Sequence, residues 1–227
     1  MYKNILTIIL LISLCTCKEE TKETTTENVV EVELSIAEKI ANAHGYANWE
    51  NVKRFDFTFG GNEEDPNSGR SWVWYPKTND ITMTTAQDTI SYNRASIDSI
   101  SRRTDGAFIN DKFWAVIPFQ LVWDEGTTIS DEMVKEAPIS KQQLNSITIT
   151  YGPEGGYTPG DAYDIFYDDE YIIKEWVYRK GNAPEPSLTT SFENYGDHNG
   201  IKIARDHKVM GSDRSVLIRN VKVEIDN

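Results

Sequence analysis

The sequence predicts an α+β protein that is mostly antiparallel β, with about ten strands and a few helices. Alternation of apolar and polar residues recurs in short stretches from Lys53 to Ile225, as is typical of half-buried strands. Most connections between these stretches are short, which favours an antiparallel meander of consecutive strands. Helical patterns are limited to the start of the domain and to one apolar segment, residues 111–126.

The first sixteen residues are typical of a signal peptide. Lys3 precedes an apolar run from Ile5 to Leu14, and a helix of that length spans only about 15 Å, half of the ~30 Å hydrocarbon core. We therefore expect residues 1–16 to be removed, not to span a membrane. The segment LCTC resembles the lipobox of bacterial lipoproteins and makes Cys17 the first mature residue, modified by acyl chains such as palmitate. Simple secretion with two incidental cysteines is the alternative.

Residues 17–33 form the predicted tether. After Cys17 the sequence KEETKETTTENVVEVE is rich in Thr, Glu and Lys and has no aromatic residue, so it cannot bury enough apolar surface to fold by itself. Two or more acyl chains on Cys17 would anchor the protein stably in a membrane. The tripeptide KEE resembles the export signal of some surface lipoproteins, and a solvated charged tether is the other explanation. We expect a lipid-anchored outer-membrane protein, with cell-surface exposure as the hypothesis that KEE supports.

The cysteines and the charge restrict the function classes. Cys15 and Cys17 are the only cysteines, so the predicted single domain, residues 34–227, has no thiol for disulfides, nucleophilic catalysis or metal ligation. The formal net charge of −13 disfavours a nucleic-acid partner, whose phosphates need Lys and Arg. Anionic lipids also repel an acidic surface, so we expect the membrane to be reached through the lipid anchor.

The domain begins with a predicted helix. Ser35 and Glu38 form an S-x-x-E capping box before an apolar-periodic stretch, and His44-Gly45 ends the helix with a glycine suited to the left-handed conformation. A surface position at the helix C-terminus, where the dipole favours a basic group, explains His44. A short second helical turn is expected around Trp49.

Strands are then expected in two series. The first is KRFDFTFGG, RSWVWYP, NDITMTT and DTISYN, with turns at Asn79-Asp80 and Gln87-Asp88. The second is LNSITITY, DAYDIFYD, YIIKEWVYR, LTTSFENY, IKIARDH and SVLIRNVKVEI, with a tight hairpin around Asp168-Asp169-Glu170. Between the two series, Pro118 interrupts the apolar residues 111–126 and predicts a short kinked helix or two turns over the sheet. Residues 127–143 are predicted to form a loop with room for one helical turn.

Several stretches together resemble the lipoprotein-carrier group of periplasmic and outer-membrane lipoprotein-sorting proteins. They are the capped helix ending in HG, the F-x-F-x-F and WVWYP strands, the segment FWAVIPFQL and the hairpin YDIFYDDEYIIKEWVY. The resemblance implies a strongly curved sheet, a half-barrel, with helices covering a concave side that holds acyl chains in some members. By this likeness the lining of the concave side would be Phe55, Phe57, Phe59, Trp72, Trp74, Trp114, Phe119, Trp123 and Trp176. Plain core packing is the alternative for these side chains.

The sequence carries no catalytic signature. G-x-S-x-G, Walker-type, H-E-x-x-H and dinucleotide-binding motifs are all missing from it, and we expect no enzyme, no cofactor and no metal site. Two weaker hypotheses are metal ligation by Asp197-His198-Asn199 with Asp206-His207, and a hydrolase that pairs Asp164 with Asp168 or Asp169. The Gly- and Pro-rich residues 151–161 are expected to form a surface loop, because a phosphate cradle would need a helix behind it.

These features together predict a bacterial envelope lipoprotein, anchored by lipid, that binds a hydrophobic ligand in the concave face of its sheet. The ligand would be an acyl chain or another lipoprotein. True carriers are soluble periplasmic proteins, whereas this chain is predicted to carry a lipid of its own. A non-enzymatic interaction module of an outer-membrane complex is therefore the first alternative, and an extracellular hydrolase is the second.

Overall fold

The computed structural model describes residues 33–62, 64–65, 67–154 and 158–226. The chain divides into two units, Met1–Glu33 and Leu34–Asn227, and the second contains all of the helices and strands described below. The predicted signal peptide, the lipidation site Cys17 and the tether up to residue 32 lie outside the described residues. Within the described part, no helix is long and apolar enough to cross a membrane.

Helix α1 (Ile36–Ala43) begins as predicted. The hydroxyl of Ser35 accepts the backbone N–H of Glu38 at 3.3 Å, and the carboxylate of Glu38 accepts the backbone N–H of Ser35 at 2.8 Å, which confirms the capping box. Gly45 follows with a φ of 95°. A Cβ at this position would lie 1.8 Å from the carbonyl oxygen of Gly200, so both the backbone conformation and the close approach require glycine.

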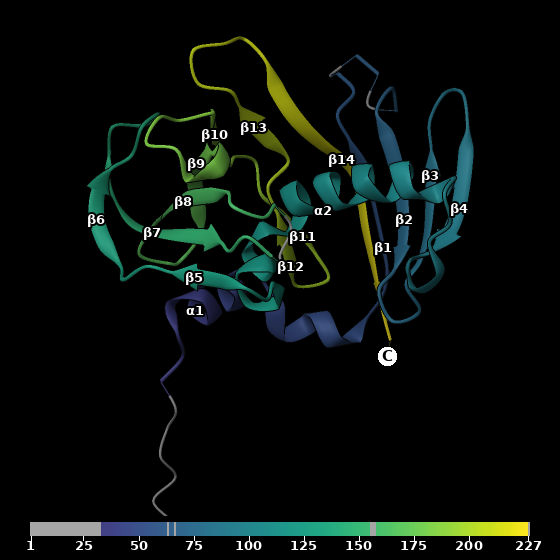
Figure 1. Cartoon of the computed structure of the whole chain (residues 1–227), viewed down its shortest axis with the longest axis horizontal. Helices are drawn as coiled ribbons and strands as arrows, with labels where there is room; N and C mark the ends of the chain where they lie inside the picture. The colour runs from purple at the N-terminus through teal and green to yellow at the C-terminus, as the bar shows by residue number, and fades with distance from the viewer. Residues whose placement is uncertain (1–32, 63, 66, 155–157, 227) are drawn as a thin grey trace, which may run out of the picture. The chain divides into compact units, whose positions relative to one another are not determined.

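The first sheet has six antiparallel strands in the order β13-β14-β1-β2-β3-β4 (Figure 1). Its strands are β1 (Val52–Phe59), β2 (Arg70–Tyr75), β3 (Asp80–Thr84), β4 (Thr89–Asn93), β13 (Asp206–Lys208) and β14 (Ser215–Ile225). The turn predicted around Trp49 is the 3-10 helix η1 (Tyr46–Asn51), and η2 (Arg94–Ser96) follows β4. Strands β1 to β4 pair in sequence order as predicted. On its other side, β1, the first strand of the domain, pairs with β14, the last strand.

The second sheet is also antiparallel, in the order β10-β9-β8-β7-β5, with β6 paired to β7 beside β5. Its strands are β5 (Thr127–Ile129), β6 (Met133–Glu136), β7 (Gln143–Tyr151), β8 (Ala162–Tyr167), β9 (Ile173–Arg179) and β10 (Leu188–Ser191). The 3-10 helix η3 (Lys180–Asn182) follows β9, and a separate hairpin joins β11 (Gly196–His198) to β12 (Ile201–Ile203). Two isolated bridges, Thr190↔Val209 and Glu193↔Asp206, connect the edges of the two sheets.

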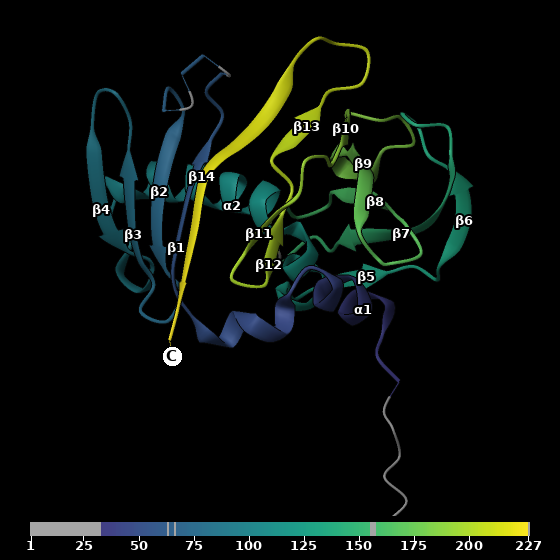
Figure 2. The ribbon, with the colours of Figure 1, turned by 180° about the vertical axis from the view of Figure 1, so that it is seen from behind.

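Helix α2 (Ser101–Trp123) packs against both sheets. Its residues Phe108, Ala115 and Phe119 belong to the first core, the buried side chains on sheet β13-β14-β1-β2-β3-β4. Phe113 and Ile117 belong to the second core, on sheet β10-β9-β8-β7-β5. The helix is therefore apolar on more than one face, as expected of a buried helix, and Figures 1 and 2 show it from opposite sides.

The structure confirms the α+β class and the mostly antiparallel pairing, and it corrects three details. The described residues form fourteen strands in two main sheets and a hairpin, not about ten strands in one sheet. The helix predicted within residues 111–126 starts at Ser101, and Pro118 lies after a break in helical geometry at Val116 (φ −130°, ψ 31°). Residues 127–143 contain strands β5 and β6, so the loop prediction was wrong. Both main sheets are open, and the half-barrel curvature stays a prediction.

Candidate functional site

The nine aromatic side chains predicted to line a concave face lie in both cores. Five of them are buried together in the first core: Phe55, Phe57, Trp72, Trp74 and Phe119. Three are partly buried at its margin: Phe59, Trp114 and Trp123. Trp176 is buried in the second core, where Trp114 also packs. The first sheet contributes five of these rings, helix α2 three and the second sheet one, so they do not share one face of a sheet.

Trp114 and Trp176 meet at a cavity of about 180 Å³ between α2 and the second sheet. Their ring centroids are 4.6 Å apart. Three residues of α2, four of strands β8 to β10 and one of the turn before β8 line the cavity: Asn110, Phe113, Trp114, Tyr163, Trp176, Tyr178, Leu188 and Thr158. Five of these eight side chains are aromatic and none is charged, so the cavity suits an apolar group.

The tyrosines of the cavity are held by short polar contacts. Tyr163 stacks on Tyr178 with centroids 5.0 Å apart, and the Tyr178 hydroxyl donates to Asp161 at 2.8 Å. The hydroxyls of Tyr163 and Thr158 lie 3.3 Å apart. Burial, together with the hydrogen bond to Asp161, raises the pKa of Tyr178 to about 12, and burial also raises the pKa of Tyr163. Both phenols are therefore neutral near pH 7.

Two buried nitrogens beside the cavity lack hydrogen-bond partners among the described residues. They are Nε1 of Trp176 and Nε2 of His207. His207 packs against Trp114 with centroids 5.4 Å apart, and its Nδ1 lies 3.2 Å from the carbonyl oxygen of Ser191. Burial lowers the pKa of His207 to about 4, so the ring is neutral. Unsatisfied polar groups of this kind are uncommon in folded proteins.

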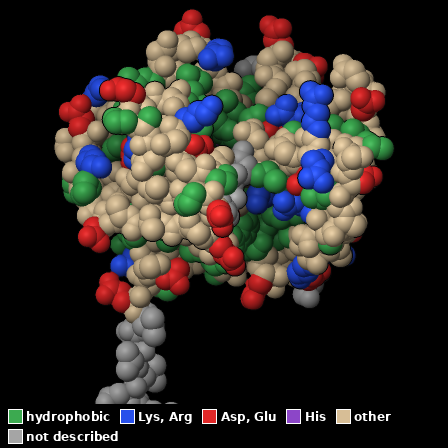
Figure 3. Space-filling model, viewed as in Figure 1, with side chains coloured by type: hydrophobic (Ala, Val, Ile, Leu, Met, Phe, Trp, Pro, Cys, Tyr) green, Lys and Arg blue, Asp and Glu red, His purple; other side chains and the backbone are tan. Residues whose placement is uncertain are grey.

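The surface of the domain is hollowed in the view of Figure 3, with apolar side chains visible along the hollow. A wider groove of about 820 Å³ lies between α1, the end of α2 and the segment from β5 to β6. Ile36, Leu121 and Ile129 are among its apolar lining residues, and Glu38, Asp131 and Glu132 are its acidic ones. Next to it in sequence, Met133 and Val134 are exposed on β6, at 46% and 64%.

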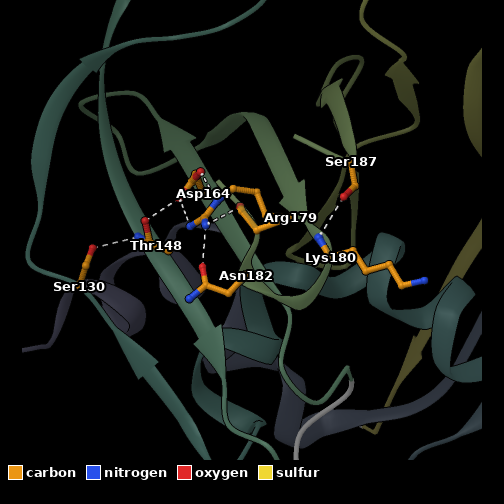
Figure 4. Close-up of polar contacts among 8 residues, drawn as sticks. Ser130, Thr148, Asp164, Arg179, Lys180, Asn182 and Ser187 are labelled. Atoms are coloured by element: carbon orange, nitrogen blue, oxygen red, sulfur yellow. Dashed lines mark hydrogen bonds and ion pairs between the residues drawn. The ribbon is translucent and has the colours of Figure 1, made fainter. Parts of the chain in front are cut away.

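The carboxylates considered for hydrolysis have structural partners. Asp164 accepts two hydrogen bonds from the guanidinium of Arg179, at 3.0 and 3.2 Å, and one from the hydroxyl of Thr148 at 2.6 Å (Figure 4). Asp168 forms an ion pair with Lys174 at 2.8 Å and accepts the backbone N–H of Ile172 within the β8–β9 turn. These contacts give Asp164 a structural role in the second sheet and Asp168 one in the β8–β9 turn. They also confirm the predicted hairpin turn.

The histidines are dispersed. The part of the chain that the structure describes contains no group of three His, Cys, Asp or Glu residues placed to hold a metal ion. Asp206, one of the proposed metal ligands, forms an ion pair with Arg219 at 2.6 Å.

His44 is fully buried, not on the surface as predicted. Its Nδ1 lies 2.8 Å from the carbonyl oxygen of Ile40, and its Nε2 accepts the backbone N–H of Ile173 at 3.4 Å. Burial lowers the pKa of His44 to about 4, so no positive charge faces the helix dipole.

Sequence reasoning missed most of the cavity lining, although signals for part of it were present. Tyr178 lies two residues after Trp176 on β9, so strand alternation places both on one face. Tyr163 is the cross-strand partner of Tyr178, a pairing that follows from the predicted hairpin. Thr158 comes from the predicted surface loop, and nothing in its local sequence indicates a cavity.

Comparisons with known proteins leave the family open. No family model matches the chain, and no curated protein matches it. A solved structure of a DUF1329 family protein from Desulfovibrio piger aligns with 85% of this chain and 92% of its own, at 8% sequence identity and a TM-score of 0.40. The likeness to lipoprotein carriers stays a prediction.

Proposed function

We propose that this chain is a lipid-anchored bacterial envelope lipoprotein that binds an apolar group of a ligand in the cavity between α2 and the second sheet. The observation that supports the proposal is the uncharged, aromatic wall of this cavity, in which Trp114 and Trp176 are two of the side chains expected to contact a ligand. The ligand class would be an acyl chain, either of a free lipid or of another lipoprotein.

The volume of the cavity restricts how such a ligand is held. An apolar cavity of roughly 150 Å³ can take up benzene, whereas pockets that enclose a drug-sized ligand measure about 300–1,000 Å³. At about 180 Å³, this cavity has room for one ring or the end of one acyl chain. The rest of a lipid would lie outside the cavity, so we expect only one end of the ligand to be enclosed.

Native mass spectrometry of the full chain, followed by solvent extraction and lipid analysis, tests the proposal. We expect a co-purifying fatty acid or phospholipid with the wild type. Leu188→Trp should fill the cavity and abolish the bound mass, because Leu188 lines the cavity from β10. Leu144→Trp is the matched control, since Leu144 is half-buried on β7 but packs against Ala137, Phe166 and Val177 on another cluster.

A wild-type mass that shows no non-covalently bound lipid, and that added lipids do not change, would refute the proposed binding. Equal lipid content in the Leu188→Trp and Leu144→Trp variants would place any lipid outside this cavity. The anchor is tested separately by labelling cells with radioactive palmitate. The wild type should incorporate label, and Cys17→Ala should not.

The wide groove between α1, α2 and the β5–β6 segment supports a second candidate function, a protein-interaction module. Its apolar lining and the exposed Met133 and Val134 on β6 are the observations that favour it. Exposed edge strands with apolar side chains are common sites of strand addition by a partner. Val134→Lys should then abolish co-purification of an envelope protein while leaving the lipid content of the chain unchanged.

A further inference from the structure

Lys112 lies on the flank of α2 that faces the first core, away from the cavity described above. Its ammonium nitrogen lies over two indole rings, 5.9 Å from the ring centroid of Trp74 and 5.7 Å from that of Trp123. Trp74 comes from β2 and Trp123 from the end of α2. These distances are typical of cation–π contacts, and the side chain is half-buried.

The ammonium of Lys112 has no hydrogen-bond or ion-pair partner among the described residues. Two carboxylates act on it from a distance, Asp105 and Asp124, but other donors occupy both. Asp105 accepts from Arg94 at 2.7 Å and from the Tyr92 hydroxyl at 3.1 Å. Asp124 accepts from the Tyr151 hydroxyl at 2.7 Å and from the Gln120 amide at 3.2 Å.

This lack of a carboxylate is unusual for a half-buried cation of this chain. At least six of the seven other half-buried Lys and Arg residues that the structure describes form an ion pair: Arg54, Arg70, Arg94, Lys174, Arg179 and Arg219. Burial, with the positive charge of Arg94 nearby, lowers the pKa of Lys112 to about 8. A carboxylate beside the ammonium would oppose that shift.

A neighbouring site shows what the missing group would be. Trp72, two residues before Trp74 on the same face of β2, donates its indole N–H to Asp111 at 2.8 Å. Arg70 binds the same carboxylate at 2.7 Å. Asp111 thus joins one cation and one indole N–H. The indole N–H of Trp74 is buried without an acceptor among the described residues, and Lys112 lies over its ring. Lys112 and Trp74 thus form a second cation and indole pair, to which none of the described carboxylates binds directly.

Apolar surface surrounds this pair. Trp49 of η1 contacts Trp74 and Trp123, with centroids 5.3 and 4.9 Å apart. A recess of about 420 Å³ lies against Tyr46, Ala47, Trp49 and Glu50. Tyr46 also contacts the ring of Trp123 at 6.2 Å. Lys112, Trp74 and Trp123 do not line this recess themselves; Trp49 connects it to them, because its ring contacts both tryptophans.

We propose that Lys112, Trp74 and Trp123 form a binding site for a monocarboxylate with an apolar body, the carboxylate pairing with Lys112 and the body contacting the tryptophans. The site does not depend on the proposed function, because the cavity is lined from Phe113 and Trp114 on another flank of α2. Aromatic and aliphatic carboxylates share this chemistry, and the experiment below separates them.

Tryptophan fluorescence and titration calorimetry of the full chain provide the test. The probes are benzoate and octanoate, with benzyl alcohol and octanol as uncharged counterparts and inorganic phosphate as a small anion. We expect at least one carboxylate to bind, and its alcohol to bind about tenfold more weakly or worse. Preference for benzoate would indicate an aromatic ligand, and preference for octanoate an aliphatic one.

Substitutions then assign the binding to Lys112. Lys112→Met keeps the length of the side chain and should weaken carboxylate binding by about tenfold or more. Lys180→Met is the matched control and should change it by less than about twofold, because Lys180 is exposed on η3 and its side chain points away from the other labelled residues in Figure 4. Lys112→Arg, which keeps the charge, should retain binding and guards against a folding defect, with circular dichroism as the check.

Three results would overturn the proposal. The first is the absence of binding by both carboxylates up to about 10 mM. The second is equal carboxylate binding by the wild type and a folded Lys112→Met variant. The third is competition by phosphate as strong as that by either carboxylate, which would make Lys112 a general anion contact and not a carboxylate site.

Discussion

Replacing Lys112 by Met should make the ligand-free protein more stable. Burial lowers the pKa of this lysine from 10.5 to about 8, and each pKa unit corresponds to about 1.4 kcal/mol, so charging Lys112 in the folded state costs at most about 3–4 kcal/mol. The remaining solvent contact reduces this cost. The substitution also removes two cation–π contacts of about 0.5–1 kcal/mol each. We expect a net gain of about 1–2 kcal/mol, because methionine keeps the apolar stem.

The pH dependence of this gain identifies its cause. Because the folded-state pKa lies below the unfolded-state value, the cost is fully present below pH 8 and is lost as the pH rises toward 10.5. The wild type should therefore approach the stability of Lys112→Met over that range. Urea unfolding at about pH 7 and about pH 10 measures the difference, and a comparison of the two proteins cancels the titration of the tyrosines.

Two outcomes would refute the reasoning about Lys112. A Lys112→Met variant less stable than the wild type at about pH 7 would mean that the ammonium has a favourable partner in the folded state. A gain that stayed constant between about pH 7 and pH 10 would mean that packing, not charge burial, is responsible.

Three further predictions concern buried polar groups. Asp111→Asn should lower the free energy of unfolding by about 3 kcal/mol in urea titrations, because it removes the buried charge that binds Arg70; a loss below about 0.5 kcal/mol, the range of surface substitutions, would contradict this. Glu175→Gln should cost about 1–3 kcal/mol, since this buried carboxylate accepts two backbone N–H groups at 2.6 and 2.8 Å, and differential scanning fluorimetry should show a lower Tm. Because the pKa values of His44 and His207 are lowered from 6.5 to about 4, their contribution to stability should fall as the pH drops through this window; thermal melts that do not change between about pH 7 and pH 4.5 would argue against buried neutral rings.

Local signals in the sequence predicted the local structure well. The capping box at Ser35 needs only four neighbouring residues, and the hairpin at Asp168 needs only the interruption of strand alternation. The start of α2 also had a local signal, which the prediction did not use. Asp98 accepts the backbone N–H groups of Ile100 and Ser101, at 3.0 and 2.7 Å, and so caps the helix. The first turns that follow it carry no apolar stripe, because their buried positions are occupied by the polar residues Ser101, Thr104 and Asp105.

Pairings over long sequence distances could not be predicted in the same way. All four residues of β6 are exposed, so this strand lacks the alternation that burial of one face imposes, and only its pairing with β7 makes it a strand. The position of β14 beside β1 depends on residues more than 150 positions apart. His44 was expected at the surface because the groups that bury it, Ile173 and Tyr195, come from distant segments.

The candidate sites show the same limit at the level of single side chains. Trp72 and Trp74 are separated by one residue on β2 and face the same core, and strand alternation cannot distinguish them. Trp72 has a carboxylate acceptor because α2 places Asp111 beside it, whereas α2 places Lys112, a donor, over the ring of Trp74. Adjacent residues of one helix thus satisfy one indole and leave the other without an acceptor. The proposed site at Lys112 depends on how helix α2 lies on the first sheet. The pattern of aromatic residues in the sequence indicates only that Trp72 and Trp74 belong to the core, and not which of them lies beside a cation.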